Sequence, residues 1–275
     1  MKKRLPLYAL LIIIALGTVF PFIWMLATSF KTLGEVFSLV PKFLPDSLFK
    51  PGMWDNYKAV LEDYNFLRFV RNSMFVACLA AIGQLFACSM AGFAFARMTF
   101  RLKDLIFSLL IATMMVPVEV TIIPEYIMML KLRWYDSYLP LIVPSALVGS
   151  FGTFLLRTTF ENIPSALEDA AFIDGVSSFQ MYSRVFLPNA RPALASLFII
   201  AFMNNWNDLL RPVIYLDTTS KFTATMGLMM FKGNYGTQWH LLAAASMIAV
   251  LPLLIVYLLA QKYFVEDLLT SGMKG

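Results

Sequence analysis

The chain has 275 residues, of which 59% are hydrophobic and 14% are charged, and its mean hydropathy is +0.71. Soluble domains carry about 25% charged residues, so this composition indicates a protein that folds in lipid. The net charge of +5 comes from scattered Lys and Arg residues, which argues against nucleic-acid binding, and one histidine without a Cys/His cluster nearly excludes a zinc site. Cys78 and Cys88 fall in one apolar run, roughly 15 Å apart along a helix, which is too far for a disulfide.

Six apolar segments approach the roughly 20 residues that a membrane-spanning helix needs. Four of them contain no Lys, Arg, Asp or Glu, namely 5–30, 72–96, 137–156 and 233–261. Two are weaker, because 105–130 is interrupted by prolines and glutamates and 192–207 is short. We therefore predict an all-α membrane protein with six transmembrane helices in one domain over residues 1–275. The spans are expected near residues 7–28, 72–96, 105–128, 138–157, 192–212 and 239–261.

The chain opens with MKKRLPLYALLIIIAL, in which cations precede an apolar run. The run exceeds the about 7–15 residues of a signal-peptide core and has no small-residue cleavage site, so we expect a retained first span. Lys and Arg are equally numerous on the two sets of loops, but they concentrate before the first span and in the short loop at 97–103. Short loops dominate the positive-inside rule, which predicts that both termini and the loop 158–191 are cytoplasmic.

The second span carries small residues at four-residue spacing, as in Gly83, Ala87 and Ala91, and again at Gly92. Such spacing lets helix backbones approach closely in lipid, so we expect a tightly packed interior helix rather than a special dimer motif. The preceding loop, 31–71, contains several prolines and is expected to be irregular and to lie on the outer face. No G-x-x-x-x-G-K-[ST] sequence is present, so any nucleotide hydrolysis takes place on another chain.

The loop between the fourth and fifth spans contains a short acidic helix. Ser165-x-x-Glu168 has the form of a capping box, in which the Ser and Glu side chains each accept a backbone N–H at the helix start. The helix is expected over 166–174, with Gly175 as a left-handed stop. A helix this short is marginal in water, so its apolar side chains need a docking surface. These side chains are Leu167, Ala170, Phe172 and Ile173.

Two docking surfaces are open at this point: the protein's own spans, or a cytoplasmic partner against which the helix projects. The chain then continues into a second short helix. Ser177-x-x-Gln180 begins that helix, and Leu187-Pro188 is expected to close it.

The loop resembles the cytoplasmic loop of ABC importer membrane subunits, whose pattern is E-A-A-x3-G-x9-I-x-L-P. The spacing is complete here. The matching residues are Asp169-Ala170-Ala171, Gly175 and Val185-Phe186-Leu187-Pro188. The chain departs from the pattern in having Asp for the first Glu and Val for Ile, and both exchanges keep the charge or the shape.

Further segments are similar to the carbohydrate-uptake branch of that family, which includes maltose- and glycerol-phosphate-type permeases. Pro117 and Pro124 in the third span fit that branch. So do Trp206-Asn207-Asp208 near the end of the fifth span, the tail Gln261-Lys262-Tyr263-Phe264-Val265 and the terminal Met273-Lys274-Gly275. The tail departs from the branch at Glu266-Asp267, where small or basic residues are more usual. The likeness covers essentially the whole chain and is weakest over 31–71.

The resemblance implies the type I ABC importer permease fold, in which the acidic helix is a coupling helix seated in an ATPase subunit. The residues that it assigns to ATPase coupling are Leu167, Glu168, Asp169, Ala170, Ala171, Phe172, Gly175, Leu187 and Pro188. It also implies a location in the inner (cytoplasmic) membrane and three kinds of partner: a second homologous permease, two cytoplasmic ATPase subunits and an extracytoplasmic solute-binding protein. This chain is then no enzyme and binds no cofactor itself, and ATP and Mg²⁺ belong to the ATPase.

The end of the fifth span is polar along one predicted helix face. Asn204, Asn207, Asp208 and Arg211 fall at i, i+3, i+4 and i+7, and Asp208 can pair with Arg211. Two interpretations stay open: a solvated end or polar lock between spans, and a cavity wall that hydrogen-bonds substrate hydroxyls. The candidates for a substrate path are Asn204, Asn205, Trp206, Asn207, Asp208, Arg211 and Glu119, with Trp206 available to stack on a sugar ring.

The cargo implied by the resemblance is a sugar, oligosaccharide, polyol or glycerol-phosphate-like solute. An ABC permease for a non-carbohydrate solute is the first alternative. A secondary transporter or channel is less favoured, because the few acids lie near span ends and no inverted repeat is visible. A membrane enzyme is disfavoured too, because no catalytic constellation or metal-binding cluster is apparent in the sequence.

Overall fold

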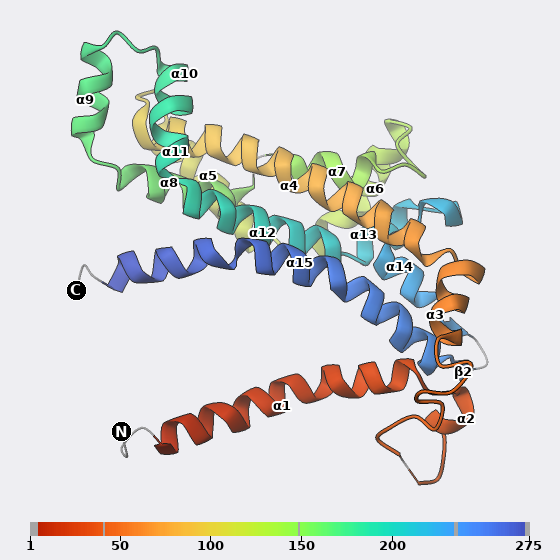
Figure 1. The fold of residues 1–275 in the computed structure, drawn as a ribbon. Helices are drawn as coiled ribbons and strands as arrows, with labels where there is room; N and C mark the ends of the chain where they lie inside the picture. Colours follow the sequence, from red (N-terminus) through yellow and green to blue (C-terminus); the bar gives the residue numbers. More distant parts are fainter. Residues whose placement is uncertain (1–4, 41, 148, 234–235, 273–275) are drawn as a thin grey trace. The chain divides into compact units, whose positions relative to one another are not determined.

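The computed structural model describes residues 5–40, 42–147, 149–233 and 236–272, so the terminal Met273-Lys274-Gly275 lie outside the described residues. The chain divides into two compact units (Figure 1). One comprises Met1–Val70 and Met226–Pro252, and the other comprises Arg71–Thr225 and Leu253–Gly275.

The first unit begins with the long helix α1 (Leu5–Ser29). Short helical segments follow it: α2 (Leu33–Val36), α3 (Asp55–Lys58) and a π-helical turn at Ala59–Asp63. The unit also contains a two-stranded antiparallel pair, β1 (Lys232–Gly233) and β2 (Gly236–Thr237). Two long helices, α4 (Phe66–Arg97) and α15 (Trp239–Gly272), run from this unit into the second, and α14 (Ala224–Met229) returns the chain to it.

The second unit contains the remaining helices. They are α5 (Lys103–Ala112), a 3₁₀ turn at Thr113–Met115, α6 (Val118–Lys131), α7 (Leu139–Ala146), α8 (Ser150–Glu161), α9 (Ser165–Ile173), α10 (Ser178–Met181), a π-helical turn at Tyr182–Phe186, α11 (Leu187–Asn189), α12 (Arg191–Asn207), α13 (Leu210–Tyr215) and a 3₁₀ turn at Thr219–Lys221.

The loop after α1 is more ordered than its proline content predicts. The Asn56 amide donates to the backbone carbonyls of Ser29 and Lys31, both at 2.8 Å. The Ser29 and Tyr57 hydroxyls lie 2.8 Å apart. The Asn56 amide thus satisfies the carbonyl at the end of α1 and one just beyond it. The expectation of an irregular loop is therefore only partly correct, because side-chain hydrogen bonds hold short helices in it.

In the described part of the chain, four helices are long and apolar enough to cross a membrane. They are Leu10–Ser29, Phe66–Arg97, Leu139–Glu161 and Trp239–Leu259. Two bent pairs raise the number to six if each pair is one span: Lys103–Met115 with Val118–Lys131, bent by 102°, and Ser178–Asn189 with Arg191–Asn207, bent by 82°. The first bend has a local cause, because a residue before proline avoids the helical region, and Val116 before Pro117 is extended.

The helix α4 packs tightly on α7 and α8 through its small residues. A Cβ added at Gly83 would lie 2.5 Å from the Cβ of Ala146, and one at Gly92 would lie 3.0 Å from the Cβ of Leu156. Carbon atoms do not approach to 2.5 Å without displacement. The prediction of an interior helix packed through small residues is confirmed at both glycines.

Asp136 fastens the loop between α6 and α7 to the segment after α13. Its carboxylate accepts the Thr218 hydroxyl at 2.6 Å, the Lys221 ammonium at 2.7 Å and the backbone N–H groups of Asp217 and Thr218 at 3.0 Å. Its own N–H donates to the Tyr215 carbonyl at 2.8 Å. The Lys221 ammonium and the other donors hold the pKa of the Asp136 carboxyl well below its ordinary value. The carboxylate thus fixes the end of α13.

The first prediction concerns the contact between α4 and α7. Gly83→Ala is expected to lower the melting temperature of the detergent-solubilised protein, because the added methyl overlaps Ala146 and overpacking costs about 1–3 kcal/mol. Gly17→Ala is the matched control, since among the described residues no atom lies within 4 Å of a Cβ at Gly17. Equal melting temperatures for the two variants would contradict the packing.

The second prediction concerns acid. Because the folded-state pKa of Asp136 is depressed, its stabilisation is present above the unfolded value of about 3.9 and is lost as the pH falls below that value. Asp136→Asn is expected to be less stable than wild type at pH 7, with the difference shrinking toward about pH 3. Melting temperatures across this range test the sign, and parallel pH profiles would disprove the role given to the carboxylate.

Candidate functional sites

The first candidate site is the helix α9 with the segment 177–189 that follows it, here called the return segment. Pro164 occupies the N-cap position in an extended conformation, and Ser165 is already helical. The Glu168 carboxylate points to the Arg97 guanidinium at 3.1 Å instead of returning to the helix start. The predicted Ser165–Glu168 capping box is therefore wrong. A charge-assisted bond to a guanidinium is stronger than a bond to a neutral backbone N–H, and sequence spacing does not reveal the distant arginine.

The end of α9 follows the prediction. Gly175 has φ +71°, in the left-handed region, its N–H donates to the Phe172 carbonyl at 3.0 Å, and the Val176 N–H donates to the Ala171 carbonyl at 3.1 Å. This pair of bonds is a Schellman motif, which satisfies the last free carbonyls of the helix. The sharp exit lets the chain turn back toward the spans.

One face of α9 packs on the protein itself and the other faces outward. Ala171 is buried in an apolar cluster, and Val176 packs against that cluster. The outward side chains stay exposed, by 44% at Leu167, 61% at Phe172 and 86% at Ile173. Of the two docking surfaces considered from the sequence, the protein's own helices hold the Ala171 side of α9. Docking of the exposed apolar side chains on a partner stays a prediction.

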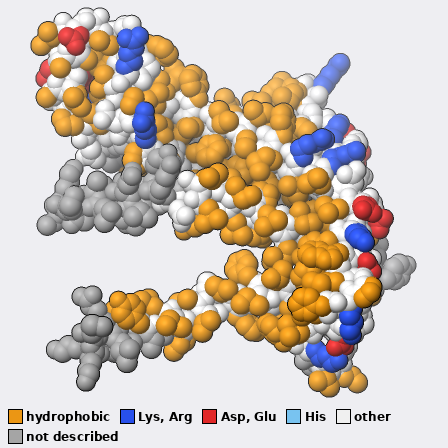
Figure 2. Space-filling model, in the orientation of Figure 1, with side chains coloured by type: hydrophobic (Ala, Val, Ile, Leu, Met, Phe, Trp, Pro, Cys, Tyr) orange, Lys and Arg blue, Asp and Glu red, His pale blue; other side chains and the backbone are white. Residues whose placement is uncertain are grey.

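The cluster behind α9 is aromatic and comes from four parts of the chain. Phe186 is fully buried, with ring centroids 5.1 Å from Phe93 and 5.8 Å from Phe160. The other buried members include Cys88, Leu156, Ile163, Met181, Tyr182, Ala190, Ala193 and Leu197. In Figure 1, α9 and α10 lie at one end of the second unit, beyond the ends of α8 and α12, and Figure 2 shows acidic and apolar side chains together on that projection.

The helix of the return segment begins at the predicted residue and ends later than predicted. The Ser177 hydroxyl accepts the Gln180 N–H at 3.3 Å, and the Gln180 side chain accepts the Ser177 N–H at 3.0 Å, so this capping box is confirmed. Helical backbone then continues past Leu187-Pro188 to Asn189, contrary to expectation, because proline is tolerated in a first helical turn.

The remaining residues assigned to coupling differ in accessibility. Asp169, Ala170 and Pro188 are exposed, and Leu187 is half-buried. Their roles in coupling stay predictions.

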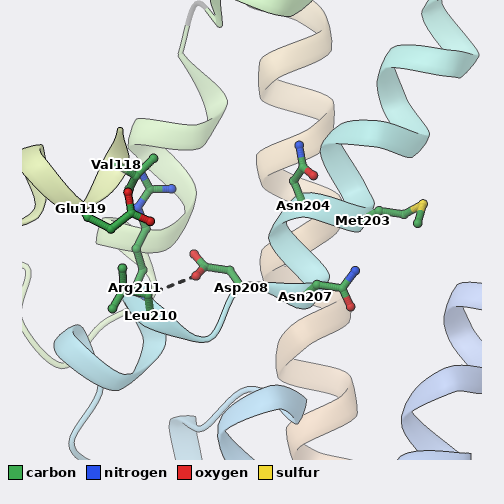
Figure 3. Close-up of a pocket in the computed structure, with 8 residues that line it drawn as sticks. All are labelled: Val118, Glu119, Met203, Asn204, Asn207, Asp208, Leu210 and Arg211. Atoms are coloured by element: carbon green, nitrogen blue, oxygen red, sulfur yellow. Dashed lines mark hydrogen bonds between the residues drawn. The ribbon is translucent and has the colours of Figure 1, made fainter. Parts of the chain in front are cut away.

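The second candidate site is a polar cavity between α6, α12 and α13 (Figure 3). Its volume is about 340 Å³, and it is lined by Val118, Glu119, Met203, Asn204, Asn207, Asp208, Leu210 and Arg211. An adjoining cavity of about 440 Å³ shares Val118, Asn204, Asp208 and Arg211. Most of the residues proposed for a substrate path therefore gather around one hollow.

The chain reaches this arrangement by breaking the fifth span, not by continuing one helix face. Asp208 is extended and ends α12, so Arg211 belongs to α13 and not to the face of Asn204. The Asp208 carboxylate accepts the Arg211 backbone N–H at 3.3 Å (Figure 3). The Arg211 guanidinium instead faces Glu125 of α6, at 3.6 Å. The predicted side-chain pair of Asp208 and Arg211 is thus wrong, because Glu125 lies closer to the guanidinium across the bend.

Two further candidates differ in their placement. Trp206 is 2% exposed and its ring stacks 5.6 Å from that of Phe202, so the prediction that it stacks on a sugar is wrong. A large aromatic side chain gains more from burial among the helices than from lining a wet cavity. Asn205 lines the adjoining cavity, although its amide donates to the Ala201 carbonyl at 2.8 Å.

Sequence reasoning missed other polar residues of the adjoining cavity. Gln84, Ser145 and Ser150 line it with the residues already named. A signal for Gln84 was present, because it is an amide in the middle of the apolar second span. Among the described residues, no group of three or more His, Cys, Asp or Glu side chains could hold a metal ion.

Known proteins resemble this chain over most of its length. Residues 84–269 match the family described as binding-protein-dependent transport system inner membrane component. The chain is 30% identical to the arabinooligosaccharides transport system permease protein AraQ of Bacillus subtilis (strain 168), over 99% of this chain and 96% of that protein. It is 34% identical to the sn-glycerol-3-phosphate transport system permease protein UgpE of Pectobacterium atrosepticum, over 73% and 72% of the two chains.

The fold has a counterpart among solved structures. A chain of a bacterial ABC transporter involved in the import of the acidic polysaccharide alginate aligns with a TM-score of 0.81 and 23% identity, over 94% of each chain. The expected all-α permease fold is thereby confirmed. The family consists of transport components, so this chain is a multi-pass membrane protein that serves transport rather than catalysis. The chain belongs to the family of binding-protein-dependent transport system inner membrane components.

Proposed function

We propose that this chain is the permease subunit of an ATP-driven importer for a sugar, oligosaccharide, polyol or glycerol-phosphate-like solute, and that it forms half of the translocation pore. The observation that carries the proposal is the exposed apolar face of α9, held from behind by the chain's own helices. The names of the similar permeases, which refer to arabinooligosaccharides and sn-glycerol-3-phosphate, support the class of solute.

The complete importer contains a second, homologous permease, two cytoplasmic ATPase subunits and an extracytoplasmic solute-binding protein. Both termini of this chain are cytoplasmic, and so is the loop that carries α9. ATP and Mg²⁺ bind to the ATPase subunits, and this chain binds no cofactor. The missing phosphate-binding loop sequence and the cations near the first span and at 97–103 support this arrangement.

The α9 helix contacts the ATPase as an amphipathic helix in a groove. Leu167, Phe172 and Ile173 leave water on docking, and each apolar side chain of this size contributes roughly 1.5–3 kcal/mol when fully buried. The exposed Asp169 lies on the same short helix and is available to a cationic side chain at the rim of that apolar groove. This contact is large enough for specific docking, and α9 is small enough to move with the ATPase as it closes.

The polar cavity belongs to the solute path. The amide and hydroxyl side chains of this cavity and the adjoining one both donate and accept hydrogen bonds, as recognition of a polyhydroxyl solute requires. They are Asn204, Asn207, Gln84 and Ser150. The pair of Arg211 and Glu125 balances charge at the edge of the polar cavity. The cavity volumes fall in the range of about 300–1,000 Å³ that is usual for small-molecule sites.

Two alternatives are separated by simple measurements. An importer for a non-carbohydrate solute would leave the ATPase contact intact and change only the solute that is taken up. A secondary transporter or channel would continue to move solute after ATP is depleted, whereas an ATP-driven importer stops.

The third prediction tests the α9 contact by purification of a tagged chain from its native membrane in mild detergent. The wild-type chain is expected to bring down a second permease and an ATPase. Ile173→Glu is expected to keep the permease and lose the ATPase, because a charge at this 86% exposed position cannot enter an apolar groove.

Leu39→Glu is the matched control, since Leu39 is also fully exposed but lies in the other unit. It is expected to retain both partners. Recovery of the wild-type chain alone, stable and monodisperse, would count against the importer and favour the channel.

The fourth prediction concerns the turn after α9. Gly175→Leu is expected to leave the protein in the membrane but to abolish ATP-coupled uptake, because a branched side chain is strained at φ +71° and the exit of the helix must change. Asn tolerates this conformation, so Gly175→Asn is expected to keep most of the activity. Wild-type uptake by the Leu variant would rule out a required turn.

A further inference from the structure

Arg97 ends α4 and lies at the junction of α8 and α9. Its side chain is 13% exposed. One guanidinium nitrogen, Nη1, donates to the Glu168 carboxylate at 3.1 Å. The other, Nη2, donates to the Phe160 carbonyl at 2.7 Å and to the Ile163 carbonyl. The guanidinium also lies 5.0 Å from the centroid of the Phe186 ring. One side chain therefore contacts α8, α9 and the return segment.

These contacts meet needs that the backbone creates. The end of α8 is the negative end of its dipole, where a cation is favourable. The Phe160 carbonyl there accepts the Ile163 N–H at 3.2 Å and has a second lone pair for the guanidinium, and the Ile163 carbonyl lies in the loop just beyond. A guanidinium presents several N–H donors in a rigid planar fork, so it satisfies those carbonyls and a carboxylate at once. The compact ammonium of a lysine cannot reproduce that geometry.

The other attachments of α9 to the second unit are weak by comparison. Ala171 buries a single methyl group, and Val176 is only partly buried. Small apolar contacts of this kind slide, whereas a hydrogen-bonded ion pair fixes both distance and direction. The link between Glu168 and Arg97 is thus the directional connection from α9 to a membrane span.

We propose that Arg97 is a positioning residue that transmits movement of α9 to α4, and through α4 to the polar cavity. The inference rests on the proposed function, in which α9 follows the ATPase. Gln84 lines the cavity that adjoins the polar one and lies on the same continuous helix as Arg97, roughly 20 Å from it along the axis. A displacement of this helix at its Arg97 end therefore also moves the cavity wall at Gln84.

The test is made on the complete importer, reconstituted in liposomes with its ATPase and binding protein, and the readout is solute transported per ATP hydrolysed. Glu168→Gln removes the ion pair and leaves the carbonyl contacts of Arg97 in place. It is expected to lower this ratio several-fold. Glu161→Gln is the matched control, because Glu161 forms an ion pair with Arg157 at 2.8 Å one turn before α9 and its side chain is 43% exposed. The control is expected to keep the wild-type ratio.

Arg97→Lys provides the second arm. This variant keeps the positive charge but loses the planar set of guanidinium N–H donors, so it is expected to lower the amount of solute transported per ATP as well. The double variant Arg97→Lys/Glu168→Gln is expected to be no worse than the more affected single variant, because residues that act through one bond are not additive. A merely structural role would lower the melting temperature and the yield of all three variants while leaving the ratio unchanged.

The outcomes separate the two proposals. An unchanged ratio in Glu168→Gln, or effects of the two substitutions that simply add, would overturn the role of Arg97. So would a Glu168→Gln chain that no longer assembles, since the pair would then serve folding. If the wild-type chain itself shows no ATP-dependent uptake with its ATPase, the proposed function fails instead.

Discussion

A chain that crosses a bilayer must satisfy its backbone hydrogen bonds internally, and the rest of this structure depends on that constraint. Long helices meet it directly, as in α4 and α15. Helices can break at membrane depth only where the freed groups find other partners or line a cavity. The break before Pro117 and the break at Asp208 both border the polar cavity. These two breaks and the polar cavity are therefore one feature.

The same need for hydrogen-bond partners governs the loop that carries α9. At the end of α8 the Arg97 guanidinium donates to the Phe160 carbonyl while it binds Glu168. A short helix that is unstable in isolation is thereby held by an ion pair and by a small contact at Ala171. Leu167, Phe172 and Ile173 stay exposed on it. Attachment and exposure are both needed if the helix is to carry force rather than simply complete the fold.

The sequence correctly predicted features that depend on hydrogen bonds or conformations within a few residues of each other. Gly175 takes the left-handed conformation, and the Ser177 box forms, because each depends on residues within one turn. The small residues of α4 predicted close packing, since no larger side chain fits at Gly83. The predictions that were wrong depend on how the helices pack in three dimensions. Glu168 binds Arg97 instead of capping its own helix, and Trp206 stacks on Phe202 instead of lining the cavity.

The sequence by itself determined that the protein lies in a membrane, which segments are apolar enough to be candidate spans, and which loop carries the pattern that resembles importer permeases, because hydropathy and turn chemistry act over short ranges. Only the tertiary structure decided which carboxylate meets which guanidinium: Arg211 pairs with Glu125 and not with Asp208. It also decided that Gln84 of α4 shares a cavity with residues of α12. Such pairings depend on how bent helices cross, and crossing geometry is a sum of many packing contacts that no single segment encodes.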